Sequence, residues 1–426
     1  MRTAQVRSFL SCQSAIRVLI VTPSFPYPPH GGAELRYYHL ITRLARQYKI
    51  SLVALTPSPV ADRFVDKMRN YCEEVVVVPR HTLPRWRQVP SILRLLLSRR
   101  PFATKYYNDD RLPQILNKLL TRRPYDILQI EHAELAGIIR VLRAEHLRNT
   151  RSLLTFHNVV HLKDRSILAL ERRPYDLMKG ILNLISMKAW ERAMTAEFDA
   201  CIAMSPDDCE ALKSFGSDIN LFTVPNGVDT HALKLLPPDK DTRTLLFVGD
   251  CNYLPNRDGV SWFYKHIFGA IRDSVPDIRL LIVGKGSDEW LYRLGADPSV
   301  SITGHVDDVV AFYERAAISI VPLRAGGGTR LKILESMALG RPIVSTSIGC
   351  QGLNVADRQH ILIADEPERF AECVVKLLHD PILSQLLITN ARQLVAAEYD
   401  WNTIARMHSE LYQWLVSGTQ PFNGKN

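Results

Sequence analysis

The chain has 426 residues, with 53 lysines and arginines against 44 aspartates and glutamates, which gives a formal charge of +9. A hydrophobic fraction of 46% and a charged fraction of 23% are typical of globular proteins and exclude a disordered or fibrous chain. No apolar run approaches the roughly 18–20 residues that a membrane span needs. We therefore expect a soluble protein of two or three domains.

The N-terminus and the cysteines indicate a reducing compartment. The opening sequence MRTAQVRSFLSCQSA starts with basic residues but has no credible apolar stretch or cleavage site, so secretion is not expected. Seven cysteines at wide spacings, without a C-x-x-C pair, predict neither a disulfide framework nor a zinc site. The expected location is the cytoplasm.

The positive charge lies in the first part of the chain. Residues 1–225 hold 33 basic and 21 acidic side chains, whereas the remaining residues hold 20 and 23. The stretch from Val75 to Asn108 has no acid and contains the apolar segment SILRLLLSRR. This segment is either a surface helix packed on the core or a helix on an anionic membrane surface, with Arg94, Arg99 and Arg100 as contacts. Nucleic acid is not expected as a partner, because no nucleic-acid-binding motif accompanies the charge.

Strand-like and helix-like segments alternate from residue 16 onward. The apolar run IRVLIVTP, a Gly-Gly pair, a helical pattern and the run ISLVALTP predict a βαβ unit. In this first half we expect further strands at 74–79, 126–132, 151–158 and 199–205, and a long helical region at 163–198.

A second series of strands follows a polar stretch near residue 240. We expect strands at 244–250, 278–286, 300–306, 317–323, 341–346 and 360–365, and an amphipathic helix at 402–416. The two series join near residue 225 and predict an α/β protein with two doubly wound, Rossmann-like domains facing a central cleft. Ligands of such folds bind beyond the carboxyl ends of the strands.

Two glycine-rich junctions between a strand and a helix are candidate anion sites. Gly31 and Gly32 open a helix, which indicates either a plain turn or a backbone that approaches an anion closely. In GGGTRLKILE the glycines precede a helix predicted to begin near Thr329, and Arg330 and Lys332 lie in its first turn. Cations oppose the helix dipole there, so their placement favours a bound anion over two solvated bases.

The other motifs, each considered alone, are weaker evidence of function. IVGKGSDEW resembles the start of a dinucleotide fingerprint, but Glu289 stands where the third glycine belongs, so a nicotinamide enzyme gains little support. His157 ends a predicted strand and is either a structural or a catalytic histidine, and His161 has the weaker case. No metalloprotease, nucleophile-elbow or Walker motif is present.

Taken together, these segments resemble glycosyltransferase family 4, retaining enzymes with the GT-B fold that use sugar nucleotides. The resemblance runs from about Ile16 to about Leu415, through GGAELR, TFHN, AMSPDD, VPNGVD, LLFVGD, IVGKG, ITGHVDD and GGGTRLKILESMALGRPIVST. The form LPNRDGVSWF resembles a subgroup of polysaccharide and exopolysaccharide assembly.

The resemblance implies a role for each part of the chain. Residues 16–225 would form an acceptor-binding domain, residues 226–400 a donor-binding domain, and 401–416 a helix packing back toward the first domain. His157 would contact the transferred sugar as the catalytic residue, and Glu335 would bind the ribose. The other implied donor-binding residues are Gly31, Gly32, Gly284, His305, Val306, Gly327, Gly328, Thr329, Arg330 and Lys332.

Two departures from the family pattern stand out. The first of the family's paired glutamates falls at Gly327, which has no carboxylate. The family's arginine and lysine after the strand-ending glycine are replaced by Asp250 and Pro255-Asn256, so Arg330 and Lys332 are the natural partners for a diphosphate.

The resemblance favours a glycosyltransferase that acts on a glycan or a lipid-linked acceptor without a cofactor or metal, in the cytoplasm or on the inner face of the cell membrane. The alternatives are a GT-B sugar-nucleotide epimerase or phosphorylase, an inactive sugar-nucleotide-binding or membrane-binding module, and, on architecture alone, a nicotinamide dehydrogenase.

Overall fold

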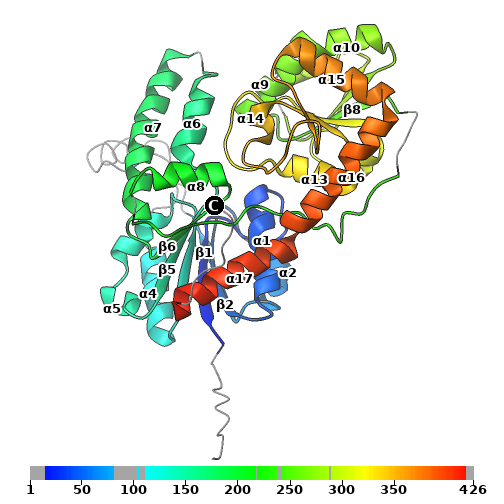
Figure 1. The fold of residues 1–426 in the computed structure, drawn as a ribbon. Coiled ribbons are helices and arrows are strands. Elements are labelled where there is room, and N and C mark those ends of the chain that lie inside the picture. The colour runs from blue at the N-terminus through cyan, green and yellow to red at the C-terminus, as the bar shows by residue number, and fades with distance from the viewer. Residues whose placement is uncertain are drawn as a thin grey trace, which may run out of the picture.

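Two parallel β-sheets, each covered by helices, form the part of the chain that this computed structural model describes (Figure 1). That part comprises residues 15–80, 101, 104, 111–171, 173–216, 218–237, 242–286 and 289–418. The basic segment with Arg94, Arg99 and Arg100 lies outside the described residues. The predicted α/β architecture of two doubly wound sheets is confirmed.

The first sheet has seven strands in the order β3-β2-β1-β4-β5-β6-β7, and all its paired strands are parallel. These strands are β1 (Arg17–Thr22), β2 (Lys49–Thr56), β3 (Glu74–Pro79), β4 (Ile127–Glu131), β5 (Arg151–Phe156), β6 (Ala200–Ala203) and β7 (Leu221–Thr223). Its helical segments are α1 (Gly32–Leu44), α2 (Asp62–Arg69), α4 (Arg111–Arg122), η2 (Ala136–Val141), α5 (Ala144–Leu147), α6 (Val160–Leu168), α7 (Pro174–Thr195) and α8 (Pro206–Lys213).

The apolar run of β1 explains why this sheet is covered on both faces. Val18 and Ile20 belong to one buried cluster, and Leu19 and Val21 belong to another. Successive side chains of a strand point to opposite faces, so a strand buried on both sides must be apolar throughout. Continuous apolar runs likewise predicted the other strands in the middle of the two sheets.

The second sheet has six strands in the order β10-β9-β8-β11-β12-β13, again with parallel pairing. They are β8 (Thr244–Val248), β9 (Arg279–Val283), β10 (Val300–Ile302), β11 (Ile318–Val321), β12 (Ile343–Ser345) and β13 (Leu362–Ile363). The helical segments are α9 (Leu254–Phe263), η3 (Tyr264–Phe268), α10 (Gly269–Ser274), α11 (Glu289–Leu294), α12 (Val310–Glu314), α13 (Leu331–Leu339), α14 (Ser347–Cys350), α15 (Pro367–His379) and α16 (Pro381–Glu398).

The last described helix, α17 (Trp401–Ser417), returns to the first sheet. In Figure 1, α17 crosses the lower half of the molecule beside α1, and Trp401 and Tyr412 are buried in the core of that half. The imidazole Nε2 of His408 lies 3.0 Å from the side-chain oxygen of Gln129 on β4. The two segments that connect the halves pair with each other, since Val228 donates to the Tyr399 carbonyl at 2.8 Å.

The helical region expected at 163–198 is two helices and not one. α6 ends at Leu168, and α7 begins at Pro174, which occupies its first turn. Proline fixes φ and lacks an N–H, so it is tolerated at a helix start and disfavoured inside a helix. In Figure 1 the two helices form a hairpin that rises beside the second sheet.

Candidate active site between the two sheets

The carboxyl ends of both sheets contribute residues to one interdomain region, and several contacts cross it. A Cβ added to Gly32, at the start of α1, would lie 3.0 Å from Leu331 Cδ1 at the start of α13. The rings of His30 and His305 lie 6.3 Å apart, and the Asn226 side-chain amide donates to Thr329 at 2.9 Å. The structure therefore brings the early Gly-Gly turn and the second glycine-rich loop together.

The glycine-rich loop of residues 326–328 packs against the β5–α6 segment. Gly326 N–H donates to the Ser166 hydroxyl at 2.7 Å, and a Cβ on Gly328 would lie 3.1 Å from the His157 carbonyl oxygen. Gly326 and Gly328 have φ values of 126° and 69°, which side-chain-bearing residues rarely adopt. The glycines therefore allow both the loop conformation and its close approach.

The position of the family's first glutamate, Gly327, has a structural explanation. A Cβ on Gly327 would lie 2.8 Å from Lys163 Cβ on α6. A glutamate there would collide with α6 in this arrangement, because atoms cannot approach within that distance. The missing carboxylate is thus coupled to the close packing of α6 on the loop.

Helix α13 begins two residues later than its sequence predicts, at Leu331, with Arg330 at the N-cap. No side chain caps this end, and its first turn contains no acidic residue. The free N–H groups and the dipole of such an end favour an anion. The predicted cations are placed here, but Arg330 precedes the first turn.

Arg330 holds the loop in shape. One guanidinium nitrogen donates to the carbonyl oxygens of Gly327 and Gly328, at 2.8 Å in the latter case. The other two nitrogens, Nε and Nη2, are buried without a hydrogen-bond partner among the described residues. Burial lowers the pKa of Arg330 from its usual value. Arg330 thus retains two donors that a ligand could occupy.

Lys332 is the second residue of α13, and its ammonium reaches the carboxyl end of β8. Its ammonium donates to Asn256 at 3.1 Å and lies 4.1 Å from the centre of the Phe247 ring. A Cβ on Gly249 would be 2.8 Å from this nitrogen. Lys332 therefore reaches the place from which the family's arginine and lysine are missing.

The charge on Lys332 is poorly compensated. Burial, together with the charge of Arg330, lowers the pKa of the lysine to about 7. Within the described residues, no carboxylate lies within 4 Å of its ammonium. Burying a cation without a counter-charge is costly, so this site favours an anionic ligand.

Glu335 lies one turn further along α13. Burial raises its pKa, while the charge of Lys332 and a hydrogen bond from Tyr313 oppose that shift. Gly284, His305 and Val306 lie beyond the adjacent strands β9 and β10. Gly284 has a φ of 145° and donates its N–H to the Gly304 carbonyl at 3.0 Å. His305 is exposed, and Val306 is half-buried.

His157 follows β5, and its ring is buried against the first sheet. Its Nε2 lies 2.6 Å from a carboxylate oxygen of Glu131, and its ring stacks on His132 with centroids 4.1 Å apart. Burial and the neighbouring His132 lower the pKa of His157 to about 4. The imidazole is therefore neutral at pH 7 and donates to the carboxylate.

Glu131, which sequence reasoning missed, is the buried partner of this histidine. Burial opposes its ionisation, but the hydrogen bond from His157 and the charges of His157 and Arg36 lower its pKa to about 2. His132 is adjacent and has a left-handed φ of 78°. The available signal was the expected strand DILQIEH, whose last two residues fall at the carboxyl end of the sheet.

His161 has a structural environment instead. Its Nδ1 lies 2.6 Å from Glu191 on α7, and the same carboxylate accepts from Val160 N–H at 2.6 Å. Glu191 is fully buried. This pair joins the two helices of the hairpin and does not reach the glycine-rich loop.

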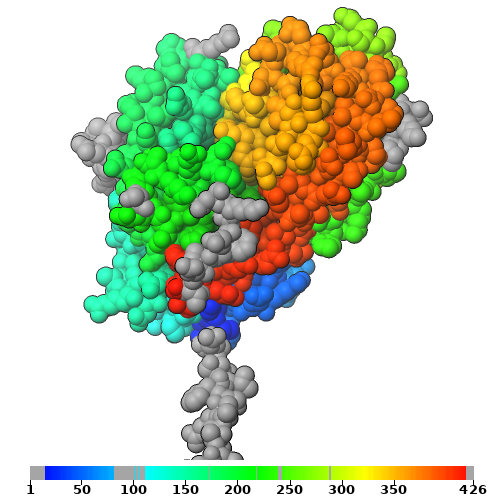
Figure 2. Space-filling view, in the orientation of Figure 1, coloured from blue at the N-terminus to red at the C-terminus, as the bar shows by residue number. Residues whose placement is uncertain are grey.

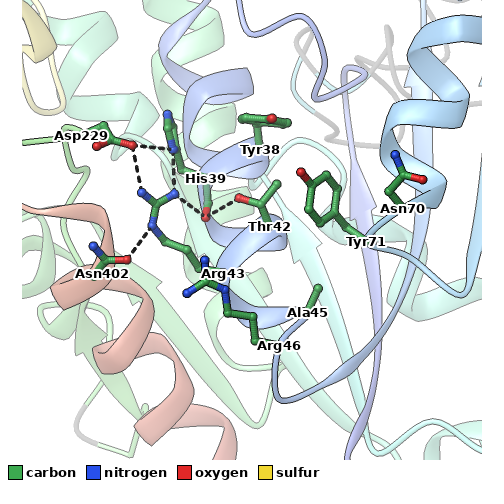
Figure 3. Close-up of a pocket in the computed structure, with 10 residues that line it drawn as sticks. All are labelled: Tyr38, His39, Thr42, Arg43, Ala45, Arg46, Asn70, Tyr71, Asp229 and Asn402. Atoms are coloured by element: carbon green, nitrogen blue, oxygen red, sulfur yellow. Dashed lines mark hydrogen bonds and ion pairs between the residues drawn. The ribbon is translucent and has the colours of Figure 1, made fainter. Parts of the chain in front are cut away.

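A separate cavity of about 510 Å³ is lined by α1, by the residues after α2 and by the connecting segments (Figure 3). There Arg43 pairs with Asp229 at 3.0 Å and with Asn402 at 3.1 Å. Asp229 neutralises this arginine, and Arg46, the other arginine that lines the cavity, is exposed to solvent. The contacts of Arg43 tie α1 to the start of α17.

Within the described ranges, no group of three or more His, Cys, Asp or Glu side chains could hold a metal ion. In the same part of the chain, no helix combines the length and apolar character needed to cross a membrane.

Comparisons with known proteins identify the class. The family model "Glycosyltransferase Family 4" matches residues 30–232, and "Glycosyl transferases group 1" matches residues 242–380. The fold is GT-B, like that of sucrose-phosphate synthase from Thermosynechococcus elongatus, at a TM-score of 0.69 and 16% identity over 95% of this chain and 100% of that one. HepE of Anabaena, solved with UDP-glucose, has a TM-score of 0.61 at 15% identity over 93% and 99%.

Two sequence relatives extend the comparison. A protein in the cps region of Klebsiella pneumoniae is 22% identical over 90% of this chain and 96% of its own length. The phosphatidyl-myo-inositol mannosyltransferase of Mycobacterium leprae is 26% identical over 48% of this chain and 56% of its own length. The chain belongs to glycosyltransferase family 4, and it is a glycosyltransferase.

Proposed function

We propose that the protein transfers a sugar from a nucleotide-sugar donor, with retention of anomeric configuration, to a glycan or lipid-linked acceptor in polysaccharide or glycoconjugate biosynthesis. The observation that carries the proposal is the uncapped start of α13, where the half-buried Arg330 and Lys332 have no carboxylate partner within 4 Å among the described residues. A diphosphate supplies the negative charge that this site lacks.

The donor lies across the second sheet in this proposal. Its diphosphate contacts Lys332, Arg330 and the N–H groups of Gly328 and Thr329. Its ribose contacts Glu335, and its base lies near Gly284, His305 and Val306. Because two cations and a helix end supply the positive charge, we expect no metal or other cofactor.

A front-face reaction fits the carboxylates that are available. Double displacement needs a carboxylate beneath the anomeric carbon. Gly327 cannot supply one, Glu131 is paired with His157, and Glu335 contacts Tyr313. The acceptor oxygen therefore bonds to the anomeric carbon on the face from which the diphosphate oxygen departs, and the acceptor proton passes to that diphosphate.

The first sheet shapes the sugar site. The ring of His157 is fixed by Glu131, and its carbonyl oxygen faces Gly328 of the donor loop. Such a fixed carbonyl stabilises a positive centre without having to reorganise. Gly32, which has no side chain, lets the start of α1 pack closely against Leu331 at the start of α13.

Support for the acceptor comes from the relatives. The mycobacterial relative is named for a phosphatidyl-myo-inositol acceptor, and the Klebsiella relative is a protein of a cps region. A protein with a basic first half that acts on a lipid-linked acceptor would work at the inner face of the cell membrane as a peripheral protein.

The test combines a donor screen with product stereochemistry. Thermal-shift assays with UDP-, GDP- and ADP-sugars identify the donor, because a ligand that binds the folded form raises the melting temperature. Proton NMR of the transfer product then gives its anomeric configuration. Retention is expected, whereas an inverted product or a trapped covalent glycosyl-enzyme contradicts the front-face reaction. Isomerised donor or phosphate-dependent cleavage would indicate the epimerase or phosphorylase alternative.

A further inference from the structure

The outward face of α7 is apolar, although nothing among the described residues covers it. Six large apolar side chains between Tyr175 and Ile185 are exposed by 38% to 70% of their surface. We call them the apolar face of α7: Tyr175, Leu177, Met178, Ile181, Leu182 and Ile185. Contiguous exposed apolar side chains of this kind mark an interaction surface.

Basic side chains surround this face. Between Val160 and Thr195, every described charged side chain that is exposed is basic: Arg165, Arg173, Lys179, Lys188 and Arg192. The acids of the same segment are less accessible. Asp164 accepts from Asn183 at 2.8 Å, and Glu191 is buried beneath His161. The exposed charge on the hairpin is therefore positive.

The hairpin is tightly packed, so the exposed face does not come from a loosely attached helix. Its inner side is closed by the Glu191 contacts with α6 and by Gly180, where a Cβ would lie 3.1 Å from Leu168 Cγ. The opposite side of α7 is the apolar face. Exposed apolar side chains flanked by basic ones bind an anionic membrane surface through both buried apolar area and attraction to anionic lipids.

The hairpin also borders the proposed donor site. Ser166 on α6 exchanges hydrogen bonds with Gly326, and Lys163 contacts Gly327. Figure 2 shows the teal surface of the hairpin directly beside the gold surface of the second half. A surface that meets α7 would therefore lie near the loop that approaches His157.

We propose that the apolar face of α7 docks on an anionic lipid bilayer, with α7 lying along the bilayer surface. Lys179, Lys188 and Arg173 contact lipid phosphates while Met178, Ile181 and Ile185 enter the boundary of the acyl chains. The inference deepens the proposed function, on which it rests for one point only: the docked face brings the cleft to a lipid-linked acceptor.

The experiment is vesicle co-sedimentation of the full chain without donor, using phosphatidylcholine vesicles with and without phosphatidylglycerol. We expect binding to the anionic vesicles, and at least about tenfold weaker binding for Ile181→Glu/Ile185→Glu, because affinity scales with buried apolar area. The matched control is Ile382→Glu/Leu386→Glu on α16, where both side chains are also exposed, at 83% and 52%. The control should bind as wild type does.

A second measurement guards against misfolding of the glutamate variant. A polarity-sensitive dye on Ile181→Cys, in a Cys12→Ser background, should shift to the blue on anionic vesicles. Its selectivity follows from the burial of the other six cysteines. Sugar-nucleotide binding in solution should be unchanged in all these variants, so loss of donor binding and loss of docking are separable.

Three results would overturn the proposal. The first is vesicle binding unchanged in Ile181→Glu/Ile185→Glu and lost only when Arg94, Arg99 and Arg100 are neutralised. The second is a dye that reports no change of environment on anionic vesicles. The third is a dimer in light scattering that the glutamate variant dissociates while its vesicle binding is unaffected, which would assign the face to a second copy of the chain.

Discussion

The start of α13 and the carboxyl ends of β4 and β5 both bury charged side chains at the interdomain site, but they compensate those charges differently. On the first-sheet side, Glu131 is paired with His157 and lies in the field of Arg36. On the second-sheet side, Lys332 and Arg330 repel each other and have no carboxylate within 4 Å among the described residues. The Glu131–His157 pair needs no ligand to compensate its charge, whereas Lys332 and Arg330 lack a counter-charge that an anion would supply.

This difference distinguishes side chains that fix the geometry of the site from side chains that bind the donor. A side chain whose hydrogen bonds are already satisfied gains little from a ligand and can fix geometry. A buried cation without a counter-charge gains the full benefit of one when it binds. Changes on the first-sheet side should therefore act mainly on turnover, and changes on the second-sheet side mainly on donor affinity.

The largest expected effect is that of His157→Ala on turnover. We expect kcat to fall by about 100-fold or more, the scale of removing one preorganised electrostatic group, while donor affinity changes little. Steady-state kinetics and calorimetric donor titration measure the two quantities. The same variant should lose about 1–3 kcal/mol of stability, because it removes the hydrogen bond that the neutral imidazole donates to the buried Glu131 carboxylate.

His161→Ala is the matched control, because it removes an imidazole that also lies 2.6 Å from a buried glutamate. It should be destabilised comparably and keep its kcat per folded molecule. If both variants lose turnover equally, the special position of His157 is refuted.

The next largest effect is that of Lys332→Met on donor affinity. Loss of a charge-assisted hydrogen bond should weaken sugar-nucleotide binding by about 1.5–3 kcal/mol, and Arg330→Ala should do the same. Isothermal titration measures the change. Arg324→Ala is the control, since Arg324 is exposed and paired with Asp258 at 2.6 Å. Wild-type affinity in both Lys332→Met and Arg330→Ala would remove the diphosphate assignment.

A change of pH should have a smaller effect on donor affinity. Lys332 has a pKa of about 7 in the free protein, and a bound diphosphate favours its charged form. Sugar-nucleotide affinity should therefore be highest below pH 7 and fall as the lysine loses its proton, by about tenfold between pH 6 and pH 8. A nucleotide sugar is the right probe, because its diphosphate does not titrate in this range.

The variant Lys332→Arg tests whether Lys332 is the group whose titration changes donor affinity. The guanidinium stays protonated, so binding should become independent of pH over the same interval. An unchanged pH dependence in Lys332→Arg would assign the titration to another group.

The smallest expected effect is that of metal removal. Because Arg330, Lys332 and the start of α13 supply the positive charge, excess EDTA should change the transfer rate by less than about twofold. A rate that collapses with EDTA and recovers with Mg²⁺ would show that these cations do not suffice.

The pattern of apolar residues in short segments of the sequence was enough to predict the two sheets. The segments VLIV in IRVLIVTP and LLFV in TLLFVGD are continuously apolar, as expected of strands buried on both faces. The three-residue strand β7 was missed, and the expected strand at 360–365 has only Leu362–Ile363 in the sheet. Short edge strands carry too little pattern to be recognised.

The site was only partly predictable, because its decisive contacts join distant residues. The sequence predicted cations at the start of α13, but it did not show that Arg330 bonds its own loop or that Lys332 reaches Asn256. The contact of Lys163 with Gly327 and the pairing of Glu131 with His157 depend on how the chain folds back on itself. Sequence spacing alone does not contain that information.

The most direct test of the account is a crystal structure with the nucleotide sugar found by the donor screen. We predict that the diphosphate oxygens lie within hydrogen-bond distance, about 3 Å, of Lys332 Nζ and the Arg330 guanidinium. The sugar should then lie between the glycine-rich loop and the His157 carbonyl. A diphosphate bound away from both cations would contradict the central claim.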